Sequence, residues 1–334
     1  MTAATAPVDA RLARATVVLG SAVRRNIWTI ALLALLVVLL LSAKVIQPRY
    51  GFIAIQGLGT SVLPLGLAAV AQAIVVIGGG IDLSIGSMMA LTSVVAATAM
   101  TGQNEQTGVV VVLGVLLLGL VLGGINGALV VTTRVPDIVV TLAMSFVWAG
   151  FALLVRAAPG GEAAQWLKDL AVGPLGNQWV PKAAVVMLLI VAIVWIPVAR
   201  SKLGLSIYAI GSNSLAAFRS GVPVGRTKFL AYALTGLFAA LAGLSLTAST
   251  GIGTPVPGPY TLESVAAVVL GGVSLAGGRG GVFGPIVAVV VLQMIRTDMT
   301  FLNIDSNLAI VAQGVILIGV LMSASLLELR RTRR

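Results

Sequence analysis

Long apolar runs, separated by short clusters of glycine, proline and polar residues, dominate the pattern of this 334-residue chain. A helix needs about 20 mostly apolar residues to cross the hydrocarbon core of a bilayer. Cutting the charge-free runs at these clusters predicts ten membrane-spanning helices. They cover residues 26–43, 55–77, 82–101, 108–132, 137–155, 182–199, 228–249, 261–277, 281–297 and 306–327. The run at 261–277 is the weakest, because it is short and contains Glu263, so a partial span there and a total of nine or eleven helices are alternatives.

The composition supports the membrane interpretation. Hydrophobic residues make up 58% of the chain and charged residues only 9%, against about 25% charged residues in an average soluble domain. So few charged side chains cannot cover the surface of a water-soluble protein of this size. Soluble enzymes, nucleic-acid-binding proteins and disordered proteins are therefore disfavoured, and the expected fold is an all-α polytopic membrane protein.

The chain contains no cysteine and no histidine. This excludes disulfides, thiolate metal sites and any catalytic set built on His or Cys. It also lacks a Gly-x-x-x-x-Gly-Lys-Ser/Thr loop, so it has no phosphate-binding loop of its own. We therefore expect no catalytic residue, metal or cofactor, and an integral-membrane enzyme is the least favoured function class.

The basic residues indicate the orientation. With the N-terminus inside, the ten-helix arrangement places 15 of the 21 basic residues on the inner side and 6 on the outer side. Cytoplasmic loops of membrane proteins carry the excess of Lys and Arg, so both termini are expected in the cytoplasm. Residues 1–25 and 328–334 then form basic cytoplasmic tails around a transmembrane domain at 26–327. No cleaved signal peptide is expected, because the apolar run after Arg25 lacks a small-residue cleavage site.

A first informative segment lies at residues 78–87, where three glycines interrupt an apolar stretch and an acid and a hydroxyl open the next helix. Glycines allow tight turns at membrane depth. One interpretation is a tight helix–loop–helix with Asp82 as the N-cap. The other is a gate beside a transport path, formed by Gly79, Gly80, Asp82, Ser84 and Gly86.

A second segment lies in the predicted inner loop at 200–228, which carries five basic residues and no acidic one. Asn213 or Ser214 can cap a short helix that runs to Arg219, with Gly221 as its C-terminal stop. Such a helix either lies on the membrane surface or protrudes and docks into a partner protein, with Phe218 as the docking knob. The segment contains Gly211, Asn213, Ala216, Ala217, Phe218, Arg219 and Gly221.

A third segment, residues 263–281, partly echoes the first. Val268-Val269-Leu270-Gly271-Gly272 stands beside Val75-Val76-Ile77-Gly78-Gly79, which suggests an internal repeat of the kind that transporters contain. Elsewhere, polar residues within apolar runs are candidates for the substrate path, with helix packing or a loop position as the alternative. These candidates are Gln72, Asn126, Thr141, Trp148, Gln293 and Asn303.

The first two segments, in this order and spacing, resemble the permease subunits of bacterial ATP-binding-cassette (ABC) importers for simple sugars, of the ribose, xylose and galactofuranose type. Residues 79–86 match the typical string Gly-Gly-Ile-Asp-Leu-Ser-Val-Gly almost unchanged. The second segment matches Tyr-Ala-Ile-Gly-Gly-Asn…Ala-Ala-Arg…Ser-Gly-Ile, with Ser212 for the second glycine and Val222 for isoleucine. The resemblance, which includes the glycines at 271–281, covers about residues 55–325.

This resemblance implies a type II importer in the bacterial cytoplasmic (inner) membrane, with a pore of two identical or paralogous permeases of about ten helices each. A cytoplasmic ATPase would supply the energy, a periplasmic binding protein would deliver the sugar, and residues 211–222 would form the coupling helix that contacts the ATPase. Residues 214–215 are Ser-Leu where acids are common in the family, which leaves the ATPase contacts open. The alternatives are an importer of the same architecture for branched-chain amino acids or a sugar-like signal, and a secondary transporter or channel without an ATPase.

Overall fold

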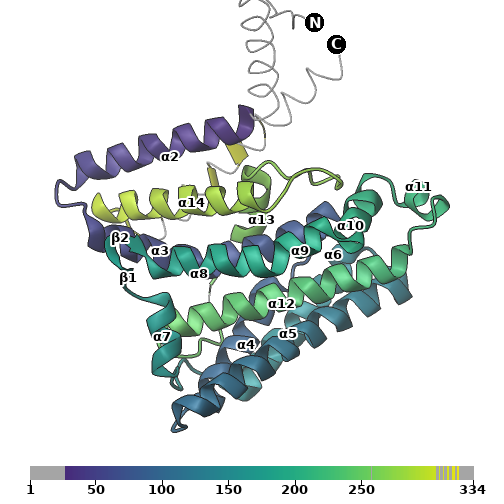
Figure 1. The fold of residues 1–334 in the computed structure, drawn as a ribbon, viewed down its shortest axis with the longest axis horizontal. Coiled ribbons are helices and arrows are strands. Elements are labelled where there is room, and N and C mark those ends of the chain that lie inside the picture. The colour runs from purple at the N-terminus through teal and green to yellow at the C-terminus, as the bar shows by residue number, and fades with distance from the viewer. Residues whose placement is uncertain are drawn as a thin grey trace, which may run out of the picture.

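The computed structural model describes residues 27–256 and 258–305, together with a few isolated positions between 308 and 322. The predicted tails at 1–25 and 328–334 and most of the predicted span at 306–327 lie outside the described residues. Within them, long helices lie side by side as roughly parallel rods (Figure 1).

Six helical segments of the described chain are long and apolar enough to cross a membrane. They are α3 (Phe52–Ile77), α5 (Glu105–Thr133), α6 (Asp137–Val155), the continuous stretch Lys182–Arg200, α12 (Val224–Thr250) and α14 (Phe283–Phe301). The stretch Lys182–Arg200 consists of α8 (Lys182–Ile190), the π-helical turn η1 (Val191–Trp195) and α9 (Ile196–Arg200). Three further apolar helices are α2 (Ile27–Ile46), α4 (Ile85–Met100) and α13 (Tyr260–Leu270). Each of the first nine predicted spans coincides with one of these segments.

The predicted boundaries of the first nine spans lie within about four residues of the observed ones, except at the end of the run at 261–277. Helix α4 begins at Ile85 and not at residue 82, and α13 ends at Leu270 and not at residue 277. Gly271 and Gly272 end α13, the latter with a φ of +79° that glycine adopts without strain. The run at 261–277 is therefore a short helix followed by a loop, as the partial-span alternative expected.

The segment between the predicted spans at 137–155 and 182–199, which the predicted orientation places on the outer side, has structure of its own. We call it the outer loop. It contains the short helix α7 (Gln165–Ala171) and a small antiparallel ribbon of β1 (Pro174–Leu175) and β2 (Asn177–Pro181). The all-α prediction thus holds for the long apolar segments, while this loop adds two short strands. Gly160 and Gly253 exchange backbone hydrogen bonds of 3.0 and 2.8 Å, which tie the loop to the end of α12.

Helix α3 forms the centre of the molecule. In the most apolar 18-residue stretch of α3, 89% of the residues are buried, because α12, α13, α14 and α8 surround this helix. In the corresponding stretches of α5 and α6, only 33% and 22% of the residues are buried, so these helices present apolar side chains outward. In a membrane protein, lipid is the natural contact for such a surface.

Glycines bring α5 and α12 into backbone contact. A Cβ atom added at Gly123 would lie 2.2 Å from the carbonyl oxygen of Tyr232, and one added at Gly236 would lie 2.0 Å from that of Gly119. Small residues let membrane helices approach this closely. The contact places Asn126 of α5 and Tyr232 of α12 next to the turn that follows α3.

The predicted short helix of the inner loop is present. Helix α10 (Lys202–Ser212) is followed by α11 (Ser214–Arg219), and Figure 1 shows α11 at the end of the molecule opposite to α7 and the β1–β2 ribbon. The side chain of Asn213 caps α11 by accepting a 2.9 Å hydrogen bond from the backbone N–H of Ala216. Gly221, with a φ of +82°, turns the chain away after α11 as predicted.

Candidate functional site

A glycine turn ends α3 and positions the first informative segment. The backbone N–H groups of Gly79 and Gly80 donate to the carbonyl oxygens of Val76 and Val75, both at 3.0 Å. Gly79 has a φ of +81°, the left-handed conformation that favours glycine. The predicted tight turn between the two helices is therefore confirmed.

The echo at the end of α13 extends to the backbone. Gly272 donates to Val269 and Val273 donates to Val268, at 3.0 and 3.1 Å, which is the hydrogen-bond pattern of the turn after α3. Gly272 also takes a positive φ, as Gly79 does. The two apolar strings thus end their helices with the same conformation, which supports the predicted internal repeat at this turn.

Asp82 is fully buried just after the glycine turn. Its Oδ1 atom accepts hydrogen bonds from the backbone N–H and the hydroxyl of Ser84, at 2.8 and 2.6 Å. The N-cap of α4 is Ser84, so the interpretation of Asp82 as the N-cap is wrong. The reason is that Asp82 closes a local turn over residues 82–84 and does not reach the N–H groups of α4.

A buried chain of hydrogen bonds leads from Asp82 across three helices. The Asn126 side-chain amide donates to the Ser84 hydroxyl at 2.7 Å, and its oxygen accepts from the Trp148 indole N–H at 3.3 Å. Asp82, Ser84, Asn126 and Trp148 are all at most 5% exposed. We call these four residues the Asp82 network. Two candidates for the substrate path, Asn126 and Trp148, therefore join the predicted gate motif.

Two hydroxyl side chains fasten the same region to neighbouring helices. Thr141 of α6, another path candidate, accepts a 3.0 Å hydrogen bond from the backbone N–H of Leu83. Thr261 of α13 accepts one of 2.9 Å from the N–H of Gly86. The segment 82–86 is thus hydrogen-bonded to both α6 and α13.

A charged cluster that the sequence did not predict covers the turn. The Tyr232 hydroxyl donates to Asp137 Oδ2 at 2.9 Å, and Lys228 Nζ lies 3.5 Å from Asp137 Oδ1. A Cβ atom at Gly80 would lie 2.5 Å from Asp137 Oδ2 and 2.8 Å from the Tyr232 hydroxyl. Gly80 is therefore in direct contact with the cluster that links α6 to α12.

The other path candidates have different surroundings. Gln72 is fully buried on α3, and neither polar atom of its side chain has a hydrogen-bond partner among the described residues. Gln293 is 8% exposed on α14, and Asn303, with a φ of +55°, lies in the turn after α14. No hydrogen bond joins these three side chains to the Asp82 network within the part of the chain that the structure describes.

The inner-loop segment divides by exposure. Phe218 is 67% exposed and Asn213, Ala216, Arg219 and Gly221 are also exposed, whereas Gly211 and Ala217 are buried. Within the described residues, no group of three or more acidic side chains could hold a metal ion. The candidate functional regions are thus the buried, hydrogen-bonded Asp82 network and the exposed end of α11 at Phe218.

We predict that Asn126→Leu lowers the stability of the protein. The substitution leaves the Trp148 indole N–H buried without its acceptor, which costs about 1–3 kcal/mol. It also removes the amide that donates to the Ser84 hydroxyl, which keeps its own bond to Asp82. Thermal unfolding in nanodiscs should show a clear fall in the midpoint. Thr132→Ala is the matched control, because the exposed Thr132 hydroxyl on the same helix donates to the carbonyl oxygen of Ala128, one turn earlier in α5. Equal midpoints for the two variants would contradict the network.

The chain is similar in sequence to known transport proteins. Residues 54–323 match the family model described as the permease component of the branched-chain amino acid transport system. The chain is 33% identical over 259 residues to a ribose import permease of Escherichia coli strain K12, a match that covers 75% of this chain and 79% of the relative. The chain belongs to this permease family.

Further relatives fit this membership. A ribose import permease of Bacillus subtilis strain 168 is 34% identical over 265 residues, covering 77% of this chain and 80% of the relative. An autoinducer 2 import system permease of Photorhabdus laumondii is 29% identical over 309 residues, covering 90% and 91%. No solved structure matches the chain. The predicted family and the predicted multi-pass membrane location of this permease are confirmed.

Proposed function

We propose that this permease is the membrane-spanning subunit of an ATP-driven importer and forms the path for a monosaccharide or a related sugar-like solute. The relatives named above import ribose or autoinducer 2, which supports a small sugar-like solute over a branched-chain amino acid. The single observation that carries the ATP-driven part is α11, a short capped helix with Phe218 67% exposed at its tip. A protruding aromatic of this kind is suited to a pocket in a separate protein.

The proposed assembly adds three partners to this chain: an ATPase, a solute-binding protein and a second permease. The chain has no phosphate-binding loop, so a cytoplasmic ATPase subunit would hydrolyse ATP. This subunit would contact exposed residues in α11 and next to its two ends, namely Asn213, Ala216, Phe218, Arg219 and Gly221. A periplasmic or extracellular binding protein would deliver the solute on the other side. A second permease, identical or paralogous, would complete the pore. The gate would be the turn at Gly79–Gly80 with Asp82, Ser84 and Gly86, and Gln72, Asn126, Trp148 and Gln293 would line or support the solute path.

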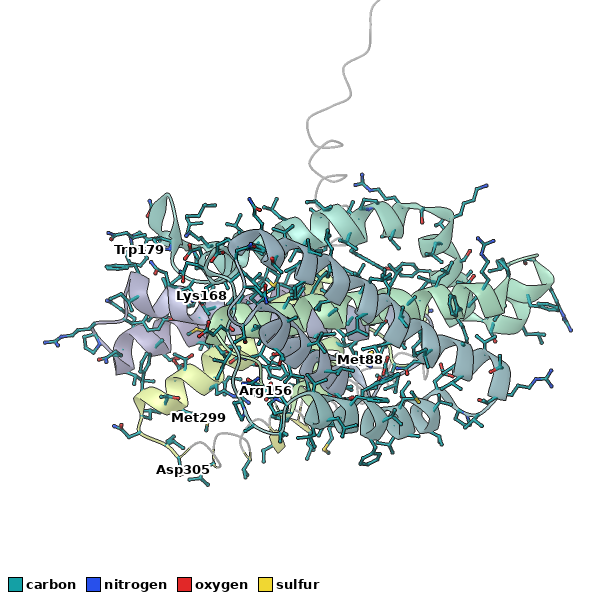
Figure 2. The ribbon with its side chains drawn as sticks, turned by 90° about the horizontal axis from the view of Figure 1, so that it is seen from below. Met88, Arg156, Lys168, Trp179, Met299 and Asp305 are labelled. Carbon is teal, nitrogen blue, oxygen red and sulfur yellow. The ribbon has the colours of Figure 1, made fainter. Side chains whose placement is uncertain are left out.

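The proposed orientation places the α11 end in the cytoplasm. Figure 2 shows Lys168, Trp179 and Met299 toward one end of the molecule and Met88, in the first turn of α4, farther from that end. The outer loop and the end of α14 therefore share one side. With nine described apolar segments and the predicted span at 306–327, a ten-helix permease has both tails on the α11 side.

Cysteine labelling tests this orientation, because the natural chain contains no cysteine. Gln178→Cys lies in the exposed β1–β2 ribbon and Ser220→Cys lies just after α11. In intact cells, a membrane-impermeant maleimide should label the Gln178→Cys variant, and should label the Ser220→Cys variant only after permeabilisation. Labelling of both variants in intact cells would contradict the proposed topology.

Reconstituted uptake tests the function itself. Proteoliposomes that contain the permease with its ATPase and binding protein should accumulate labelled ribose or autoinducer 2 when ATP is supplied, and should ignore labelled leucine. Accumulation of leucine alone would favour the branched-chain amino acid alternative. A secondary transporter or channel would instead move solute without any ATPase present.

A further inference from the structure

Three segments that are far apart in the sequence meet in backbone contact at the C-terminal end of α3. A Cβ atom added at Gly211 would lie 1.9 Å from the carbonyl oxygen of Ile77 and 2.6 Å from the backbone nitrogen of Gly278. One added at Gly277 would lie 2.7 Å from the carbonyl oxygen of Gly211 and 2.9 Å from the Cα of Gly79. The backbone N–H of Gly278 also donates to Ile77 at 2.8 Å. We call Gly79, Gly211, Gly277 and Gly278 the glycine junction.

On one side, the glycine junction is connected to α11 by a stiff linker. Gly211 lies in the last turn of α10, and only Asn213 separates α10 from α11. The Asn213 N–H donates to Ala209 in α10 at 3.1 Å, its carbonyl accepts from Ala217 in α11 at 2.9 Å, and its side chain caps α11. Because of these bonds, we expect a displacement of α11 at Phe218 to move α10 with it.

On the other side, the glycine junction leads to the Asp82 network. Gly79 belongs to the turn that ends α3, and Asp82 follows it by three residues, fully buried and bonded to Ser84. Tyr208 of α10 adds a second tie, because its hydroxyl donates to the carbonyl of Gly280 at 2.9 Å. The end of α10 is thus in contact with the turn after α3 and with the glycine-rich loop after α13.

We infer that Gly211 is a positioning residue that couples α11 to the Asp82 network through the glycine junction. The inference rests on the proposed function, and it gives Gly211 a role different from direct contact with the ATPase. Side chains at a contact can change rotamer and absorb a small displacement, whereas main-chain atoms in van der Waals contact cannot. A displacement of α10 is therefore transmitted to the turn at Gly79, and ATP binding changes the surroundings of Asp82 through that contact.

The test uses Gly211→Ala in the complete importer, with Ser87→Cys as a reporter. Ser87 is half-buried in the first turn of α4, and the reporter thiol is the only one in the permease because this chain has no cysteine, so its labelling is read on the permease band. In the parent, trapping the ATPase with ATP and vanadate should change the labelling rate of the reporter thiol. In Gly211→Ala, the ATPase should co-purify at the parental ratio and hydrolyse ATP, while solute moved per ATP falls by about tenfold or more and the reporter no longer responds.

Gly114→Ala is the matched control, because nothing lies within 4 Å of a Cβ atom added there. It should keep the parental uptake, hydrolysis and reporter response. Parental coupling and reporter response in Gly211→Ala would overturn the inference while leaving the proposed function intact. Failure of the parent permease to bind an ATPase would overturn both.

Tyr208→Phe tests the same coupling if the Gly211→Ala permease does not assemble. This variant removes the hydrogen bond to Gly280 and adds no atom to the glycine junction. Solute moved per ATP should then fall by about twofold or more with hydrolysis retained. An unchanged ratio together with a parental reporter response would overturn the inference.

Discussion

Gly80→Leu should abolish solute uptake. Even the first added atom, Cβ, would lie 2.5 Å from Asp137 Oδ2, 2.8 Å from the Tyr232 hydroxyl and 3.0 Å from Val75 Cγ1. Leucine adds three further carbons in a region where α3, α6 and α12 already meet. Overpacking of this kind typically costs about 1–3 kcal/mol, occasionally more, and here it must displace the Asp137–Tyr232 contact or move the turn that leads to Asp82.

The measurement for Gly80→Leu is uptake of labelled solute at matched membrane levels of the protein, with thermal unfolding in nanodiscs alongside. Gly114→Leu is the control, because Gly114 is exposed on α5 and its surroundings are open. We expect parental uptake in the control. Gly80→Ala separates gating from folding, since its smaller overlap should leave the protein in the membrane and still reduce uptake. Parental uptake by both Gly80 variants would show that the close approach at this turn is irrelevant to transport.

The double substitution of Phe218→Ala with Arg219→Glu should release the ATPase and abolish uptake. Both residues are exposed on α11, and Phe218 is an exposed aromatic side chain at the end of the molecule that we assign to the cytoplasm. Aromatic anchors at the centre of an interface commonly contribute about 2 kcal/mol or more. Replacement of Arg219 by glutamate also removes an exposed cationic hydrogen-bond donor and reverses the charge at that position.

Retention of the ATPase during purification distinguishes docking from the alternative that α11 rests on the membrane surface. Under docking, the double variant inserts at the parental level and keeps its unfolding midpoint, and the ATPase is lost. Trp179→Ala with Lys182→Glu is the matched control, because it changes an exposed aromatic and a nearby base at the opposite end of the molecule. That control should retain the ATPase. Co-purification of the ATPase with the double variant at the parental ratio, with uptake intact, would favour membrane resting.

Local rules explain which parts of the fold could be predicted. Apolar run length located the helices, and capping chemistry placed α11 between Asn213 and Gly221, because each of these signals depends on residues within a few positions of one another. The start of α4 was misplaced for a related reason. Asp82 is a suitable N-cap by residue type, but its carboxylate is engaged by Ser84 before α4 begins.

Contacts between distant segments could not be predicted in the same way. Asn126 meets Ser84 across 42 positions, and Tyr232 meets Asp137 across 95. Such pairs depend on how α5, α6 and α12 pack, which the glycines of α5 and α12 control through backbone contact. Gly211 shows the consequence, because the family resemblance puts it in the segment that we expect to contact the ATPase, whereas the fold buries it against Gly79 and Gly277.

We expect this permease to move its solute only when an ATPase drives it, and uphill accumulation in proteoliposomes measures this most directly. The permease, its ATPase and its binding protein are reconstituted with labelled ribose or autoinducer 2, and solute inside is compared with solute outside. We predict accumulation above the external concentration with ATP, and none when the phosphate-binding lysine of the ATPase is replaced. Accumulation to the same level with that inactive ATPase, or with the permease alone, would contradict the account.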